Sequence, residues 1–347
     1  MFKFMNMSAE VVARSPGRVN LIGDHTDYTG GMVLPMAIDR YTTITAQPLE
    51  AAIQLTSADQ PDELRCKLPL VDPASIVPEW GRYVTGVAAL LNVEHGFSGS
   101  VSTTLPLGGG LSSSAALELS TALTLCLIND LPALTSLELA QLCRFAEHLA
   151  TGVPCGIMDQ LTCASGVVGR ALLIDCHSLQ VSPIEIPQDV NIYVQFIAHR
   201  QLASSAYSDR VTQCAQAEEH IGPLRLAEVG SVRNIADDVL RRRAMHVVSE
   251  NDRVRRATVA LTLQDMTTFG QLMNESHQSL RDNFEVSTAQ MDEAVRSAQQ
   301  TPGVFGARMT GGGFGGCIVI AADSSADLKS LEGAMRVKPV SGAQLIN

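Results

Sequence analysis

Residues 106–116 have the sequence Pro106-Leu107-Gly108-Gly109-Gly110-Leu111-Ser112-Ser113-Ser114-Ala115-Ala116. Three consecutive glycines let a backbone approach a ligand closely and adopt positive φ, and three serine hydroxyls follow them. The apolar run over 115–128 then predicts a buried helix. Because a helix N-terminus carries unpaired N–H groups and a partial positive charge, this segment suits a polyphosphate and its metal ion. The alternative is a helix whose serine is only an N-cap, but the triple glycine favours phosphate.

Two familiar motifs do not fit this glycine-rich segment. The Walker pattern ends in Gly-Lys-Ser/Thr, and the sequence contains no Gly-Lys pair. The nucleophile elbow requires Gly-x-Ser-x-Gly, and no glycine follows these serines at the required position. The segment is therefore predicted to bind phosphate in another way.

The composition indicates a globular protein that acts on something small. The chain has 347 residues, of which 46% are hydrophobic and 18% are charged, which is enough for one large domain or two. Its net charge of −11 argues against a nucleic-acid partner, because phosphate backbones require clustered Lys and Arg. The basic cluster Arg241–Arg243 is expected to be a solvated helix face.

Cysteines and apolar runs predict where the protein works. Eight cysteines occur without a C-x-x-C pair, which is typical of reduced thiols in the cytoplasm and not of a zinc site. The first eight residues lack the apolar core of a signal peptide, and no run of 18 apolar residues predicts a membrane span. We therefore expect a cytoplasmic enzyme with no membrane partner.

Hydrophobic periodicity predicts a mixture of strands and helices. Alternating patterns predict strands over 11–13, 19–22, 33–36, 42–46, 52–56, 64–68, 101–105, 171–174, 181–186, 191–197 and 317–321. Helical spacing predicts helices over 80–91, 115–128, 137–149 and 206–221, a short helix from 155, and broken helices within 236–300. Pro183 and Pro187 mark a change of composition, so we predict two domains, residues 1–185 and 186–347.

The polar segment 23–31 is a candidate binding loop. It places two aspartates, a histidine and a tyrosine within five residues, Asp24–Tyr28, shortly after Arg18. Carboxylates and imidazole form directional hydrogen bonds, which favours a hydroxyl-rich ligand. The alternative is an Asp/Gly turn whose side chains cap their own backbone.

Three further side chains have both a structural and a functional interpretation. Glu147 lies on a predicted amphipathic helix, and Asp159 lies in the first turn of a short helix among apolar residues. Asp159 could only offset the helix dipole, but a desolvated carboxylate without a role is expensive. Trp80 begins an apolar helical stripe, which is more often core than a nucleobase contact.

Gly311, Gly313 and Gly316 satisfy G-x-G-x-x-G, yet a predicted strand follows them, so a dinucleotide site is rejected.

Four motifs in this order resemble the galactokinase family of the GHMP kinase superfamily. They are residues 18–28 (RVNLIGDHTDY), 106–115 (PLGGGLSSSA), 155–160 (CGIMDQ) and 308–316 (RMTGGGFGG). The resemblance implies an α+β fold of two lobes, with an N-terminal lobe like ribosomal protein S5 domain 2 and a ferredoxin-like C-terminal lobe. It also implies ATP-dependent phosphorylation of the anomeric hydroxyl of galactose, with Mg²⁺ as cofactor, by a monomer.

The resemblance assigns a role to each matching residue. Asp159 matches the catalytic aspartate and Arg18 the arginine beside it. The magnesium ligands match Ser114 and Glu147. The sugar contacts match Asp24, His25, Asp27, Gly156 and Tyr207. ATP binding is assigned to Gly108, Gly109, Gly110, Leu111, Ser112, Ser113 and Trp80, and Gly311–Gly313 line the site from the second domain.

One position departs from the family pattern. The family usually has Gly-Glu-His where this chain has Gly23-Asp24-His25, and the shorter side chain withdraws the carboxylate by about 1.5 Å. A kinase for a related sugar is therefore an alternative. A second alternative is a galactokinase-like sensor that binds sugar and ATP without turnover, although Glu147 and Asp159 argue against it.

Overall fold

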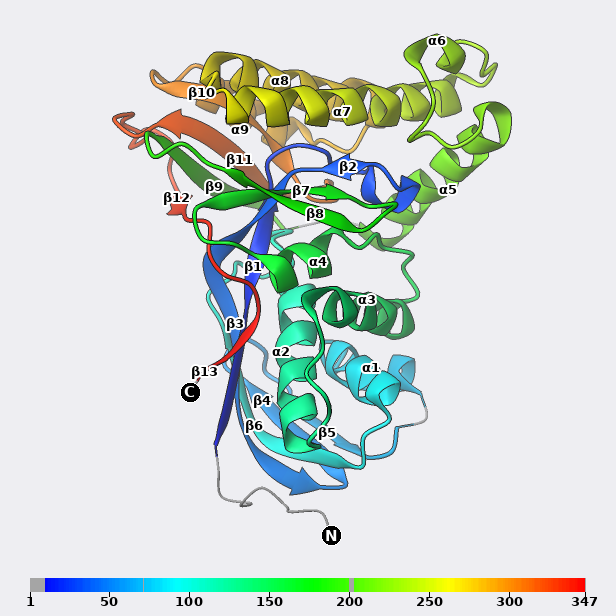
Figure 1. Cartoon of the computed structure of the whole chain (residues 1–347), viewed down its shortest axis with the longest axis vertical. Helices are drawn as coiled ribbons and strands as arrows, with labels where there is room; N and C mark the ends of the chain where they lie inside the picture. The colour runs from blue at the N-terminus through cyan, green and yellow to red at the C-terminus, as the bar shows by residue number, and fades with distance from the viewer. Residues whose placement is uncertain (1–9, 71, 200–202, 347) are drawn as a thin grey trace.

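Two long, neighbouring strands, β1 (Val11–Asn20) and β3 (Pro35–Glu50), belong to a six-stranded sheet (Figure 1). The computed structural model describes residues 10–70, 72–199 and 203–346. The strand order is β13-β1-β3-β6-β4-β5, and every neighbouring pair is antiparallel except β6 with β4. The remaining strands are β4 (Ala52–Ser57), β5 (Leu64–Lys67), β6 (His95–Thr103) and β13 (Gln344–Ile346).

Four helices cover one face of this sheet (Figure 1). They are α1 (Gly81–Leu91), α2 (Ser113–Ile128), α3 (Ser136–Thr151) and α4 (Met158–Ser165). The central helix α2 packs on β1 and β3 and also contacts the other three helices. Its Leu119 and Leu125 are fully buried, and each such side chain contributes about 1.5–3 kcal/mol through burial. This packing fixes where the N-terminus of α2 lies.

The second half of the chain builds a four-stranded sheet of order β10-β11-β9-β12. Its strands are β9 (Val190–Ala198), β10 (Val304–Thr310), β11 (Gly316–Asp323) and β12 (Ala334–Val337). A three-stranded sheet, β2-β7-β8, joins Met32–Val33 to Arg170–Asp175 and Gln180–Glu185. Helices α8 (Met266–Ser279) and α9 (Ala289–Gln299) pack against β10, and α7 (Asp238–Thr262) packs against α8 (Figure 1).

The fold also contains further helical segments. Helices α5 (Ala203–Ile221) and α6 (Val229–Val232) extend to one side of α7 (Figure 1). Two 3₁₀ turns cover Asp27–Thr29 and Pro73–Ser75, and a π-helix over Leu280–Phe284 continues directly from α8. No helix in the described ranges is long and apolar enough to cross a membrane.

Most predicted elements are confirmed, with shifted ends. Helix α2 begins at Ser113, and the strands predicted over 11–13 and 19–22 are one strand with a bulge between Pro16 and Gly17. Strand β10 was missed, because Gly306 and the charged Arg308 interrupt its apolar pattern. Arg308 is nevertheless fully buried, since it pairs with carboxylates.

The prediction of a solvated face at Arg241–Arg243 is wrong for Arg243. Its side chain is only 3% exposed and pairs with Glu285. A run of like charges on a helix usually faces water, but here the helix turns one member of the run inward against a charged partner. Arg241 and Arg242 stay partly exposed.

Candidate active site

A cavity of about 950 Å³ brings together most of the side chains that the sequence singled out. Its volume suits a nucleotide together with a small substrate. The predicted site residues in its wall are Arg18, Asp24, His25, Asp27, Trp80, Gly108, Gly110, Ser112, Ser113, Ser114, Glu147, Gly156, Asp159, Tyr207 and Gly311–Gly313. Gly109 and Leu111 do not line it: Leu111 is in the core, and Gly109 packs against Pro106 and Cys317.

Two residues donate hydrogen bonds to Asp159 in the wall of this cavity. Arg18 donates from Nε at 2.8 Å and from Nη2 at 2.6 Å to Oδ1, and the Ser112 hydroxyl donates to Oδ2 at 2.7 Å. The Arg18 side chain is 4% exposed and that of Asp159 is 29% exposed. Arg18 also donates from Nη1 to the Gly110 carbonyl at 2.7 Å. The ion pair therefore ties the aspartate to the phosphate loop, residues 106–114.

The phosphate loop approaches β1 closely. The Arg18 N–H donates to the Leu111 carbonyl at 3.1 Å, and a Cβ on Gly17 would lie 2.5 Å from the same oxygen. Ser112 adopts a left-handed backbone with φ 62, and its side chain does not cap α2. Ser112 occupies the N-cap position of α2, but its hydroxyl donates to Asp159, so the alternative of a serine that serves only as an N-cap does not describe this residue.

Glu147 lies on α3, and its carboxylate accepts hydrogen bonds from a nitrogen and a sulfur donor. Gln160 donates from Nε2 to its Oε2 at 2.6 Å, and the Cys155 thiol approaches the same oxygen at 3.5 Å. Burial and the nearby charge of Asp159 raise the pKa of Glu147, while a hydrogen bond from Ser114 partly opposes this. None of the described residues forms an ion pair with Glu147.

The hydroxyl oxygen of Ser114 and the carboxylate oxygens of Glu147 are suitable ligands for Mg²⁺. Magnesium usually takes one or two protein carboxylates and completes its shell with waters and substrate phosphates. Within the described part of the chain, no group of three or more His, Cys, Asp or Glu residues could hold a metal by itself. A site that needs phosphate oxygens to be complete agrees with both observations.

Asp27 belongs to residues 23–31, which we call the sugar loop after its predicted ligand. The Asp27 carboxylate lies against Gly156. A Cβ on Gly156 would lie 1.9 Å from Oδ2 of Asp27, so only glycine leaves room for this carboxylate. Burial first and the neighbouring Asp159 second raise the pKa of Asp27 to about 7. Two carboxylates that repel each other across a cavity can both accept hydrogen bonds from one polyhydroxyl ligand.

Aromatic rings surround His25 on the other side of the sugar loop. Its ring centroid lies 5.9 Å from that of Tyr28, 5.6 Å from Tyr207 and 4.7 Å from Phe284. The Tyr28 hydroxyl lies 3.1 Å from Nδ1 of His25. His25 has φ 65, a conformation that a residue with a Cβ keeps only where its surroundings hold it.

Asp24 lines the cavity, but its carboxylate is also part of a buried network. Oδ2 lies 2.7 Å from Nη2 of Arg308, and Oδ1 accepts from the Gly311 N–H at 3.0 Å. Asp24 is 1% exposed, and Arg308 is fully buried with Glu250 as a second acidic neighbour at 3.8 Å. This network joins the sugar loop to the glycine loop, residues 311–316.

Trp80 lies at the start of α1, on the wall of the cavity. Its indole Nε1 donates to the Asp62 carbonyl at 3.2 Å.

Gly108 and Gly110 in the phosphate loop both have positive φ, 70 and 72. Glycine therefore lets this loop turn with its backbone facing the cavity.

Sequence reasoning missed several buried polar residues in the cavity wall or next to it. Gln160 bridges Glu147 to Glu118 on α2, donating to the Glu118 Oε2 at 3.2 Å. Glu118 is fully buried, and burial raises its pKa well above the ordinary value. A single charged residue within the apolar run 115–128 was the signal that could have identified it. Glu250 gave no such signal, because it lies among other polar residues, whereas Arg308 is a single charge between Ala307 and Met309.

Comparisons with known proteins agree with this arrangement. Residues 3–48 match the galactokinase galactose-binding signature. Residues 82–167 match the GHMP kinase N-terminal domain, and residues 257–338 match the GHMP kinase C-terminal domain. These matches confirm the predicted α+β GHMP kinase fold, with its N-terminal and C-terminal parts.

Individual relatives are similar over nearly the whole chain. Galactokinase of Bos taurus is 42% identical over 343 residues, which cover 91% of this chain and 85% of that protein. The crystal structure of Lactococcus lactis galactokinase complexed with galactose has a TM-score of 0.92 at 30% identity, covering 97% of this chain and 95% of that one.

The fold alone is shared more widely. Mevalonate kinase of Methanococcus jannaschii has a TM-score of 0.72 at 21% identity, over 96% of this chain and 99% of that one. The galactokinase-specific signature and the identity to galactokinases are what separate this chain from other kinases of similar fold. The chain therefore belongs to the galactokinase family of the GHMP kinase superfamily.

Proposed function

We propose that the protein transfers the γ-phosphoryl group of ATP to the anomeric hydroxyl of galactose, giving galactose 1-phosphate and ADP. The observation that carries this proposal is Asp159 in the cavity wall, with Oδ1 held by Arg18 and Oδ2 by Ser112. Phosphoryl transfer to a hydroxyl needs mainly positioning and charge neutralisation. We assign to Asp159 the role of accepting the proton of the sugar hydroxyl, and to Arg18 that of orienting its carboxylate through the ion pair.

The sugar would lie beside the sugar loop. We assign hydrogen-bonding roles to Asp24, His25, Asp27 and Tyr207, and Gly156 leaves the space that the Asp27 carboxylate occupies. The aromatic rings beside His25 provide the apolar surface on which a sugar ring can pack.

ATP would lie along the phosphate loop. The proposed contacts are the main-chain N–H groups of 108–112, Ser113 at the start of α2, and Trp80 on the nucleobase side. Ser114 and Glu147 would hold Mg²⁺, which when bound neutralises phosphate charge and orients the transferred group. Their side chains come from α2 and α3, two helices that pack against each other.

We also propose how the chain is organised and where it works. Residues 1–185 and 186–347 form two domains, except that β13 pairs with β1. One chain provides every proposed ligand contact, which supports a monomer. No disulfide joins any of the eight cysteines, all of which lie in the described residues, and this supports the cytoplasm as its location.

Turnover with a panel of sugars tests the proposed function. ADP release from MgATP is measured with galactose, its 2-deoxy, 2-acetamido and 6-deoxy analogues, glucose and arabinose. We expect galactose to be preferred, and Asp159→Asn to lower kcat at least about 100-fold while calorimetry still detects galactose binding.

Asp189→Asn, an exposed position far from the cavity wall, is the matched control and should leave kcat unchanged. Preference for another sugar would show that Asp24 changes specificity. Near-normal turnover by Asp159→Asn would contradict its role as proton acceptor. Binding of sugar and ATP without turnover by the wild type would establish a sensor.

A further inference from the structure

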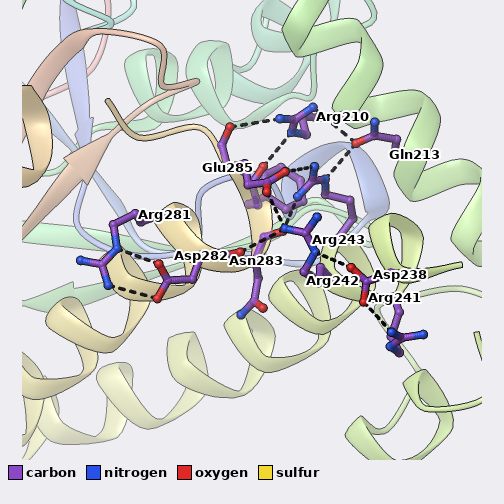
Figure 2. Close-up of polar contacts among 11 residues, drawn as sticks. Arg210, Gln213, Asp238, Arg241, Arg242, Arg243, Arg281, Asp282, Asn283 and Glu285 are labelled. Carbon is purple, nitrogen blue, oxygen red and sulfur yellow. Dashed lines mark hydrogen bonds and ion pairs between the residues drawn. The ribbon is translucent and has the colours of Figure 1, made fainter. Parts of the chain in front are cut away.

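Three arginines surround the C-terminal end of the π-helix Leu280–Phe284 (Figure 2). Together with Glu285 we call Arg210, Arg242 and Arg243 the arginine clamp. The last carbonyls of a helix have no partner within the helix, and here guanidinium groups supply the donors. Arg242 donates to the carbonyl of Asp282, Arg243 to that of Asn283, and Arg210 to those of Phe284 and Glu285.

The side chain of Glu285 closes the arginine clamp. Its Oε1 lies 2.5 Å from Nη1 of Arg242 and its Oε2 lies 2.5 Å from Nη2 of Arg243. Arg242 and Arg243 hold the pKa of Glu285 at about 2. Glu285 itself has φ 56, which is unfavourable for a residue with a Cβ. The clamp therefore maintains a backbone conformation that the residue alone would leave.

The arginine clamp does not resemble an anion site. Arg243 is 3% exposed, and each of its three donor nitrogens already has an acceptor, on Gln213, Asn283 or Glu285. Arg210 likewise donates to Gln213 and to two carbonyls. Figure 2 shows the guanidinium groups directed at the chain segment between them. The arginines therefore hold residues 282–285 in place, and the contacts of this segment and of Val286 after it indicate what the arginines do.

Residues 284–286 contact residues next to or in the candidate active site at two points. The fully buried ring of Phe284 lies 4.7 Å from the ring of His25 and 4.6 Å from that of His246. His246 in turn lies 3.1 Å from the Asp24 carbonyl oxygen. Two residues further along, the Val286 carbonyl accepts from the Phe314 N–H at 2.8 Å, and it would lie 2.4 Å from a Cβ on Gly313.

We propose that the arginine clamp positions the sugar loop, by fixing Phe284 against His25 and Val286 against the glycine loop. Glu285, Arg242 and Arg243 are then positioning residues for galactose, although none of them lines the cavity. The inference rests on the proposed function, because it assigns the sugar to the loop that carries His25. ATP, assigned to the phosphate loop and Trp80, should not depend on the clamp.

The test begins with Glu285→Gly, which removes the carboxylate and suits the left-handed backbone. We expect the galactose KM, and the galactose Kd from calorimetry, to rise about fivefold or more, while the MgATP KM stays within about twofold. Arg281→Gln is the matched control: it removes an exposed ion pair with Asp282 on the same turn (Figure 2) and should change neither constant.

A double-mutant cycle with Phe284→Leu tests the route. If the arginine clamp acts through the ring of Phe284, the double variant should raise the galactose KM no more than the larger single effect. Thermal unfolding of each variant confirms that it is folded. Additive effects, an unchanged galactose KM in Glu285→Gly, or equal rises in the KM of galactose and ATP would each overturn the inference. Failure of the wild type to phosphorylate galactose would instead reject the proposed function.

Discussion

At the scale of single residues, Asp27 shows a conflict between stability and function. It faces Asp159 across the cavity, and burial together with this neighbour raises its pKa to about 7. Removing the charge should stabilise the ligand-free protein and weaken galactose binding, because functional sites often retain unfavourable charges. We expect Asp27→Asn to raise the galactose Kd at least about tenfold.

The stability effect of Asp27→Asn should depend on pH. Below about pH 4 the carboxyl is protonated in both the folded and the unfolded chain, so the variant gains nothing. Between about pH 4 and 7 the unfolded chain ionises first, and the wild type loses stability as the pH rises. Above pH 7 the gain should be constant, on the order of 2 kcal/mol because water in the cavity screens part of it.

Urea unfolding of both proteins from pH 4 to 8 measures this difference. A gain that is independent of pH, or one that grows toward low pH, would contradict the assigned pKa. Asp189→Asn, which is exposed, provides the reference for removing one carboxylate elsewhere.

At the scale of elements, Gln160 joins three helices behind the proposed metal site. It lies on α4 and donates both to Glu118 of α2 and to Glu147 of α3. Losing one member of a buried hydrogen-bonded pair leaves the other unsatisfied, whereas replacing both by apolar groups is nearly neutral. Gln160→Leu should therefore lower the free energy of unfolding by about 1–3 kcal/mol. Adding Glu118→Leu should restore most of it.

The same two variants separate stability from metal binding. Both lack the donor that orients Glu147, so both should need more Mg²⁺ for half-maximal turnover, by about threefold or more. Urea unfolding and a magnesium titration of activity are the two measurements. The interpretation fails if the double variant is no more stable than Gln160→Leu, or if neither variant changes the magnesium requirement.

These elements also show what a sequence can and cannot predict. Helix α2 and the phosphate loop were predictable, because a glycine run followed by an apolar run has few other structures. Arg18 was predicted beside Asp159 only through the family resemblance, and the contact with Ser112 was not predicted, because these residues lie 141 and 47 residues away from Asp159 along the chain. The burial of Arg243 was unpredictable for the same reason, since its partner Glu285 follows the π-helix, 42 residues further along the chain.

At the scale of the whole molecule, the two ends of the chain meet in one sheet. Strand β13 pairs with β1 through Val12–Ile346, Ala13–Leu345 and Arg14–Gln344. Just before β13, the N–H groups of Gly342 and Ala343 donate to carbonyls of Gly166 and Cys163, at the end of α4. The C-terminal segment therefore covers the edge of β1, which carries Arg18, and supports the helix that carries Asp159.

Removing residues 342–347 tests how much this closure contributes. The deletion leaves an edge of β1 and two carbonyls at the end of α4 without their backbone partners, and each such hydrogen bond contributes about 0.5–1.5 kcal/mol. We expect the melting temperature to fall by about 5 °C or more, since about 1 kcal/mol shifts a domain of this size by 2–4 °C or less. Leu345→Thr with Ile346→Thr keeps the backbone pairing and is the matched control; it should change the melting temperature by less than about 2 °C.

Because the same segment supports both Arg18 and Asp159, the deletion should also lower kcat more than it raises either KM. An undiminished melting temperature would mean that the strand pairing of the two chain ends adds nothing to the stability of the fold.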